Sequence, residues 1–207
     1  MIKCQKCGWE ISWGRNVKFC PNCGAPIPAP TISSGIRVAA FIILLILCIS
    51  VTAIGASIKI EVSEARSLSH EVESLENAVR SIGFQAIFGN NFMHALIMFA
   101  PIVGPIWGFS VLYNTGKVIA AISIVNELDP RLNMLVLFFF PFTWMEYISY
   151  ALAISESIFL TYSIIKRNFR EEFTTASKLV VLCSIILLIA ALIEFYVISL
   201  LESSLKI

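Results

Sequence analysis

Long apolar runs decide what kind of protein this chain can form. The clearest runs cover residues 36–58, 92–113, 142–165 and 179–201. Each is about as long as the roughly 20 residues that a helix needs to cross the hydrocarbon of a bilayer. Charged residues make up 14% of the chain, against roughly 25% in a typical soluble domain. The sequence therefore predicts an all-α, multi-pass membrane protein whose first partner is the lipid bilayer.

Four cysteines near the amino end predict a separate metal-binding module over residues 1–24. They form two Cys-x-x-Cys pairs, and a glycine follows each pair so that backbone amides can approach the sulfurs. Four thiolates close a tetrahedral shell around zinc, and metal binding would supply the folding energy that so small a module lacks. We expect a zinc ribbon whose ligands are Cys4, Cys7, Cys20 and Cys23. A pair of disulfides or a redox motif fits a reducing compartment poorly, whereas an iron site with the same ligands stays open.

Apolar side chains near the cysteines are expected to cover the metal site: Trp9, Ile11, Trp13, Val17 and Phe19. Residues 25–35 follow with three alternating prolines, which predicts an extended, semi-rigid linker. The small positive charge of the ribbon is too weak to indicate nucleic-acid binding. We therefore expect no nucleic-acid partner.

Residues 59–82 differ from the spans, because apolar residues recur there at alternating steps of three and four between glutamates. This apolar seam consists of Ala65, Leu68, Val72, Leu75, Val79 and Ile82. Such a pattern predicts an amphipathic helix, which we place outside the membrane within an extracytoplasmic segment at 59–90. The seam would either pack on the protein's own helices or headgroups, or pair with a second copy or another protein.

Residues 88–146 are apolar enough for lipid, yet they carry prolines, glycines and polar side chains that hydrocarbon cannot satisfy. Carboxylates, amides and imidazoles at membrane depth usually face a bundle interior or a water-filled cavity. We predict an intramembrane polar core made of Asn90, Asn91, His94, Asn114, Gly116, Glu146 and Glu156. Glu146 lies close after Pro141, near a helix start, and is expected to be buried and bonded to Asn91, Asn114 or freed amides.

Proline and glycine also predict where helices break in this region. The run at 92–113 is either one kinked span or a re-entrant segment that breaks between Ala100 and Gly108. Gly104 and Gly108 form a small-xxx-small pair, which favours close helix packing. The four residues 114–117 are typical of a turn or an unwound segment.

Further along, Pro141 is expected to separate a short, part-depth segment at 132–140 from a full span at 142–165. The basic residues Lys166, Arg167, Arg170 and Lys178 then place this loop in the cytoplasm, and Arg37 places the amino end there too. An even number of crossings must separate the two, so a fourth crossing is expected from about 108–128. We predict five spans in the cell membrane and a cytoplasmic amino terminus.

Short motifs between residues 36 and 200 match one known family. They are the pair Asn90-Asn91, the glycines Gly104 and Gly108, Asn114 with Gly116, and Pro141 with Glu146. On these residues the chain resembles the stage II sporulation protein M family, with the ribbon as an addition. Thr115 interrupts the family's Asn-Gly turn, and Phe142-Thr143 replaces its His-Gly. The resemblance implies a membrane component that recruits a peptidoglycan-degrading complex during engulfment in spore-forming bacteria.

Two functions follow from these features. The first is a membrane scaffold that organises envelope proteins, or further copies of itself, through a cytoplasmic ribbon and an outer helix. The second is a transporter or channel component that uses the polar core as its pathway. We expect no enzyme, because the sequence has no nucleophile elbow or intramembrane aspartate pair, and His70-Glu71 lacks the second histidine of a zinc protease. A dry, closed polar cluster would favour the scaffold, and a solvent-connected cavity would favour transport.

Overall fold

The structure is a computed structural model that describes residues 2–4, 6–11, 19–25, 32–166 and 169–205. The chain divides into two compact units, Met1–Ile36 and Arg37–Ile207. Several residues with predicted roles lie outside the described part of the chain: Trp13, Val17, Arg167 and the prolines of the linker.

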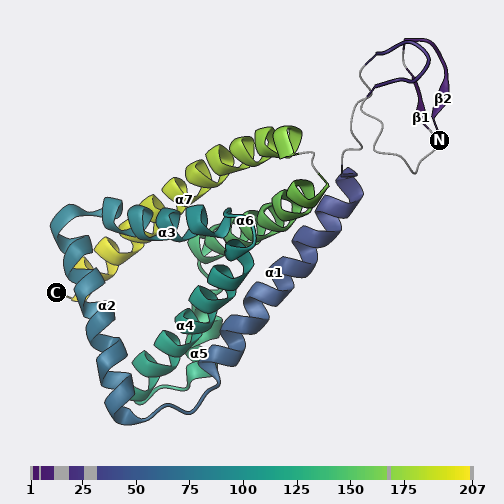
Figure 1. Ribbon diagram of the computed structural model, residues 1–207. Coiled ribbons are helices and arrows are strands. Elements are labelled where there is room, and N and C mark those ends of the chain that lie inside the picture. Colours follow the sequence, from purple (N-terminus) through teal and green to yellow (C-terminus); the bar gives the residue numbers. More distant parts are fainter. Residues whose placement is uncertain (1, 5, 12–18, 26–31, 167–168, 206–207) are drawn as a thin grey trace. The chain divides into compact units, whose positions relative to one another are not determined.

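The first unit contains a small antiparallel sheet. Strand β1 (Ile2–Lys3) pairs with strand β2 (Glu10–Ile11), as Figure 1 shows. The side chains of Lys3 and Glu10 face each other across the pair at 3.3 Å. Two residues per strand provide little stability alone. The module therefore needs further stabilisation, and the segment between the strands contains Cys4 and Cys7.

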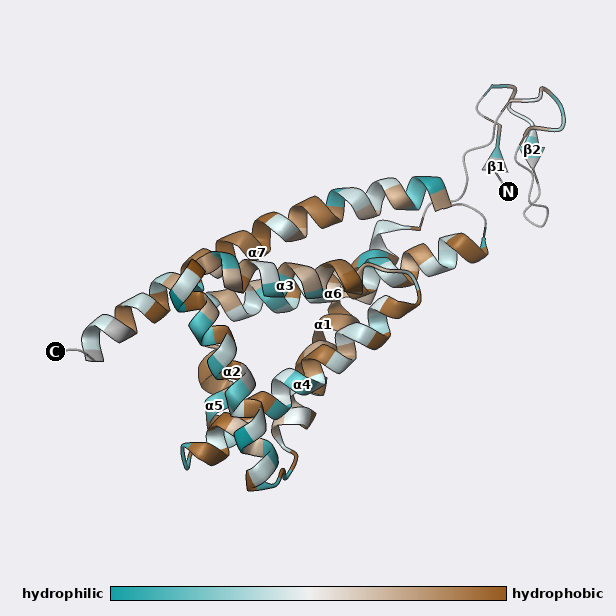
Figure 2. Cartoon of the chain, turned by 60° about the vertical axis from the view of Figure 1, so that its left-hand side comes forward, coloured by the Kyte–Doolittle hydropathy of each residue, from teal (hydrophilic) through white to brown (hydrophobic). Residues whose placement is uncertain are grey.

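The second unit is helical. Its elements in chain order are α1 (Ser34–Ala56), α2 (Val62–Ile82), α3 (Phe84–Met98), α4 (Val103–Val125), α5 (Pro130–Leu137), α6 (Pro141–Ile165) and α7 (Phe169–Leu205). Four of the described helices, α1, α4, α6 and α7, are long and apolar enough to cross a membrane. Figure 2 shows apolar residues predominating along α1 and α7, and more polar residues on α2. The predicted all-α membrane fold is confirmed.

Contacts near the helix ends fix the direction of each spanning helix. Arg37, at the start of α1, bonds to Glu156 in the second half of α6 and to Glu172 near the start of α7. Gly55, near the end of α1, lies against Gly116 in the second half of α4. The other end of α4 lies against Ser157 of α6, next to Glu156. Helices α1, α4 and α7 therefore run in one direction, and α6 runs in the other.

The chain returns from the end of α1 to the start of α4 through α2 and α3, because α1 and α4 run in the same direction. The prediction of two crossings, at 92–113 and at about 108–128, is wrong, because one spanning helix, α4, runs from Val103 to Val125 and residues 92–98 belong to α3. The count of spanning-length helices is four among the described residues, not five. The return segment α3 has 15 residues, about 22 Å at 1.5 Å per residue, which is shorter than the roughly 30 Å of hydrocarbon.

Residues 114–117 are helical, so the predicted turn there is wrong. Thr115 turns its hydroxyl onto the Val111 carbonyl one turn back, at 3.0 Å. Gly116 lets α1 approach closely, because a Cβ atom at this position would overlap the carbonyl oxygen of Thr52. Lys117 pairs with Glu64 of α2 at 2.5 Å. The residues whose composition favours a turn therefore make contacts with α1 and α2 that stabilise the helix.

The predicted break after Ala100 is present and is sharp. The amide of Val103 donates to the Pro101 carbonyl at 2.7 Å, and Ile102 between them has φ 68° and ψ −51°. This is the strained, classic form of the γ-turn. Helix α6 holds the turn in place, since the Ile102 amide donates to the Thr161 hydroxyl at 2.9 Å. One turn earlier in α6, the Ser157 hydroxyl donates to the Ala100 carbonyl at 2.6 Å.

Two prolines start helices, and one of them, Pro141, was predicted to do so. Pro130 follows Asp129, whose carboxylate caps α5 by accepting from the Arg131 amide at 2.8 Å. Pro141 is the first residue of α6, in agreement with the predicted division between a short segment and a full span. Helix α7 begins at Phe169, earlier than the predicted span start at 179.

The core lies where α1, α3, α4, α6 and α7 meet. Fully buried side chains at its centre are Cys48, Met98, Leu112, Ile154 and Leu187. The small-xxx-small prediction for Gly104 and Gly108 is confirmed. A Cβ atom on Gly108 would come within 2.5 Å of the Ile154 side chain, and one on Gly104 would meet Ser157 at the same distance. These glycines therefore set the spacing between α4 and α6.

The apolar seam of α2 is partly covered by the protein itself. Ala65, the first residue of the seam, is fully buried, and Val79 packs with Ile87 of α3 and Ala191 of α7, whereas Ile82, the last residue, is 58% exposed. Leu75, between them, is 40% exposed. The helix is separate from α1, because residues 57–61 are not helical. The first interpretation of the seam, packing on the protein's own helices, therefore holds at Ala65 and Val79.

Candidate functional site

The four ribbon cysteines come together at one point. Their sulfur atoms all lie within 4.8 Å of one another. Cys4 and Cys23 are 3.6 Å apart, and Cys7 and Cys20 are 3.5 Å apart. Sulfurs at about 2.3 Å from a central zinc sit roughly 3.8 Å from each other in a tetrahedron, whereas a disulfide needs about 2.05 Å. The cluster therefore fits a metal ion and does not have the geometry of two disulfides.

The two cysteine pairs have the same backbone structure. The amide of Cys4 donates to the carbonyl five residues later at 2.9 Å, and the amide of Cys20 does so at 2.7 Å. Gly8 and Gly24, which donate back to the carbonyls of Cys4 and Cys20, have φ of 71° and 67°. Positive φ at these two positions explains why each pair is followed by glycine. The predicted turn is confirmed in both copies.

Electrostatics in the cluster favour a bound cation. The pKa of the Cys7 thiol is lowered to about 6, chiefly because the Trp9 amide donates to its sulfur. At Cys23 the Ala25 amide favours the thiolate, but the Cys7 sulfur, burial and the other two sulfurs together raise the pKa to about 12. Four neighbouring thiolates repel one another, and a positive ion at their centre would remove that repulsion. These residues could hold a metal ion, and the donor set suits zinc or iron.

Within the helical unit, the structure brings Asn91 and Glu146 together. The Asn91 amide, on α3, donates to the Glu146 carboxylate, on α6, at 2.5 Å. Both side chains are half-buried. Asn90 donates in turn to the Asn91 oxygen at 3.3 Å. Glu194 of α7 is close enough to act electrostatically on Glu146, so three helices contribute polar groups at this point.

Glu156 belongs to a different cluster. It is 1% exposed, and the Arg37 guanidinium donates to one of its oxygens at 2.9 Å. Arg37 also donates to Glu172 and lies over the Phe159 ring, with 4.9 Å from its guanidinium carbon to the ring centre. The second oxygen of Glu156 is buried with no partner among the described residues. Two carboxylates thus share one guanidinium where α1, α6 and α7 meet.

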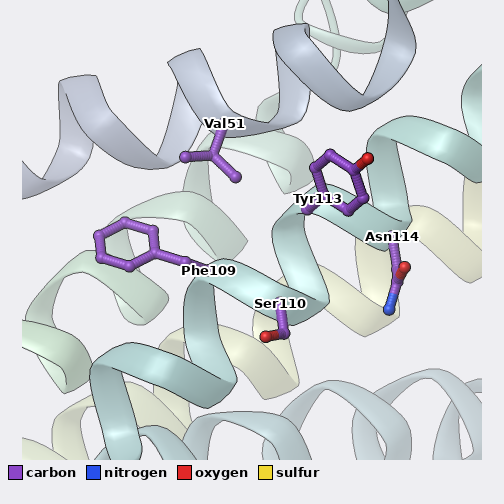
Figure 3. A pocket seen from close by; sticks show the side chains of 5 residues that line it. All are labelled: Val51, Phe109, Ser110, Tyr113 and Asn114. Atoms are coloured by element: carbon purple, nitrogen blue, oxygen red, sulfur yellow. The ribbon is translucent and has the colours of Figure 1, made fainter. Parts of the chain in front are cut away.

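His94 and Asn114 do not join either cluster. His94 lies beside Trp107, with ring centres 5.9 Å apart, and its Nδ1 atom is buried without a partner in the described structure. Asn114 is exposed on α4 and borders a pocket between α1 and α4 (Figure 3). The prediction that Asn114 would meet Glu146 is therefore wrong, because the continuous helix turns Asn114 outward. Gly116 is a packing position, with no polar contact of its own.

Sequence reasoning missed the partners of Arg37. The sequence analysis used Arg37 only to place the amino end in the cytoplasm. Glu172 lies in a segment that was expected to be a loop. One signal in the sequence could have found them. A carboxylate such as Glu156 inside a span needs a nearby cation to pair with. The hydroxyls of Ser157 and Thr161, one turn apart on α6, also went unassigned.

Comparison with known proteins does not place the chain in a family: no family model, no curated protein and no solved structure matches it. Two arrangements of side chains in the structure bear on function. One is a four-thiolate cluster able to hold a metal ion. The other is a set of polar pairs that join helices within the membrane unit.

Proposed function

We propose that this chain is a membrane scaffold whose amino-terminal ribbon binds zinc and contacts envelope proteins. The observation that supports the proposal is that polar side chains of the helical unit bond to one another between helices. Asn91 pairs with Glu146, Arg37 with Glu156 and Glu172, and the Tyr147 hydroxyl donates to Thr52 at 2.8 Å. These groups join helices to one another, which suits a rigid platform better than a pathway.

The pocket bordered by Asn114 supports the same choice over transport. Its lining comes from α1 and α4 and includes neither Asn91 nor Glu146. A transport pathway needs polar groups that face a shared aqueous space. Glu146 and Glu156 instead bond to different partners, so they do not form one binding site between them.

Zinc rather than iron is proposed for the ribbon because the module is small and its role is structural. Zinc has no redox chemistry and takes a closed shell of four cysteines in structural sites. When bound, it would hold Cys4, Cys7, Cys20 and Cys23 as thiolates. Trp9 and Phe19 are 52% and 61% exposed beside the cluster and would be available to a protein partner. A cytoplasmic amino end and a place in the cell membrane belong to this proposal, as does the role implied by the sporulation family.

A photo-crosslinking amino acid at Trp9 tests the scaffold directly. In native membranes, the metal-loaded chain should give discrete adducts that mass spectrometry can identify. The matched control carries the same crosslinker with Cys20→Ser and Cys23→Ser, which removes the metal site but leaves the helices unchanged. The adducts should disappear in that control. Identical adducts from both chains, or solute flux in liposomes that Glu146→Gln abolishes, would reject the scaffold.

A further inference from the structure

Asn114 faces outward from α4, a helix long and apolar enough to cross a membrane. It is equally distant in sequence from Val103 and Val125, the two ends of α4. Its side chain is exposed, and it makes no hydrogen bond to any residue that the structure describes. Hydrocarbon can neither donate to an amide nor accept from it. An unpaired, outward-facing amide on a helix of spanning length is therefore best satisfied by a partner from outside the chain.

The polar neighbours of Asn114 on α4 do not have this problem. Ser110 donates its hydroxyl to the Ile106 carbonyl at 2.8 Å, and Thr115 donates to the Val111 carbonyl at 3.0 Å. A hydroxyl can be satisfied by its own helix in this way, with no second helix. The Asn114 amide has two donors and an oxygen acceptor, and all of them are left over.

An open pocket lies beside Asn114 on the outer surface of α1 and α4. The pocket has a volume of about 460 Å³ and is lined by Val51, Phe109, Ser110, Tyr113 and Asn114. Figure 3 shows Val51 projecting from α1 and the other four side chains from α4. Ile106, Ser110 and Asn114 follow one another at steps of four along α4, and all three are exposed. The small serine in the middle of this stripe allows close approach of a second backbone.

We propose that this stripe, Ile106–Ser110–Asn114, binds the same stripe on a second copy of the chain. All copies insert in a membrane with one orientation, so a two-fold axis along the membrane normal sets identical residues opposite each other at the same depth. An asparagine amide is self-complementary, because its donor fits the oxygen of an identical amide. The two Asn114 side chains would then satisfy each other. A lipid acyl chain at this depth offers no such partner. This inference does not depend on the ribbon or on its metal.

Dilution in liposomes measures the pairing. Full-length chain, labelled with a single fluorophore, is reconstituted over a range of protein-to-lipid ratios, and photobleaching steps count copies per complex. Asn114→Ala should raise the dissociation constant roughly 3- to 20-fold, the range found for hydrogen bonds between membrane helices. Thr115→Val is the matched control, since it also removes an exposed polar group from α4. Its dissociation constant should equal that of the unchanged chain.

Crosslinking locates the interface independently of affinity. Ser110→Cys should give a covalent dimer on mild oxidation of the metal-loaded protein, well above the unchanged chain. Val181→Cys, at a site on α7 that is 58% exposed, should not. A monomer at every dilution would overturn the proposal. So would equal pairing by the Asn114→Ala chain, crosslinking through Val181→Cys alone, or a lipid that co-purifies with a monomer and is lost with Asn114.

Discussion

The bond between Asn91 and Glu146 joins α3 to α6, and it sets the cost of changing either residue. Glu146→Ala should lower the free energy of unfolding by about 1–3 kcal/mol, because it leaves the Asn91 donor unpaired. Glu146→Gln should cost less, since its amide oxygen can still accept. Thermal unfolding of the purified protein in detergent measures both. Equal losses from the two variants would show that the carboxylate charge matters, and not only the acceptor.

Single residues also show how far the sequence could be interpreted alone. Asn91 and Glu146 were predictable as a pair because each is costly in lipid and Glu146 lies near the start of α6. Asn114 has the same chemistry as Asn91 and was assigned to the same core. Its direction depends on α4 continuing through Gly116, and that depends on how closely α1 approaches. No local pattern contains this information.

Two elements carry structural features that a variant can test, and the ribbon is the first. In the proposed zinc ribbon, Cys20→Ser removes one of four ligands, and a bound metal would supply the folding energy of the module. The variant should therefore lose both its metal and the fold of the ribbon. Helices α1–α7 should remain folded, since they form a separate compact unit. Elemental analysis of the purified protein, with circular dichroism for helix content, measures the two effects. A variant that keeps one equivalent of metal would contradict the ligand assignment.

The turn between α3 and α4 is the second element. Ile102 is β-branched and has φ 68°, a conformation that costs about 1–3 kcal/mol. Glycine adopts it freely but loses about 0.5–1 kcal/mol of backbone entropy on folding. Ile102→Gly should therefore leave stability unchanged or raise it by up to about 2 kcal/mol.

The matched control for this turn is Val103→Gly, one residue later in the first turn of α4. It should lower stability by about 0.5–1 kcal/mol, since no strain is released there. Chemical unfolding curves of the two variants measure their stability. If Ile102→Gly lowers stability as much as Val103→Gly does, the turn is not strained.

Elements with strong patterns were predictable. The cysteine spacing predicts the ribbon turns, and Pro130 and Pro141 begin helices because proline suits the first turn. The turn predicted at 114–117 is wrong because the composition of these residues favours a turn, whereas packing against α1 and the ion pair with Glu64 favour a helix. Tertiary contacts outweighed local preference there. The predicted number of long spans was wrong for a related reason, because α3, with 15 residues, is shorter than the roughly 20 residues that a spanning helix needs.

At the scale of the whole molecule, Arg37 and Glu172 place the start of α1 and the start of α7 on one side of the membrane. The end of α1 and the start of α2 must lie on the other side, because α1 spans. Cysteines introduced singly at Ser67 and Glu171, both exposed, should therefore react with an impermeant thiol reagent from opposite sides of sealed vesicles. Reaction of both from the same side would disprove the arrangement of the helices.

The short return helix has a consequence for the surrounding lipid. Helix α1 has 23 residues and α3 has 15, so their lengths are about 34 Å and 22 Å. Met93 and Leu96 on α3 are 49% and 44% exposed, so lipid tails reach this helix too. A bilayer of even thickness cannot match both helices at once, and each ångström of mismatch costs a fraction of a kcal/mol. We expect lipids beside α3 to shorten or draw their headgroups inward, which would give the protein a thin side and a thick side.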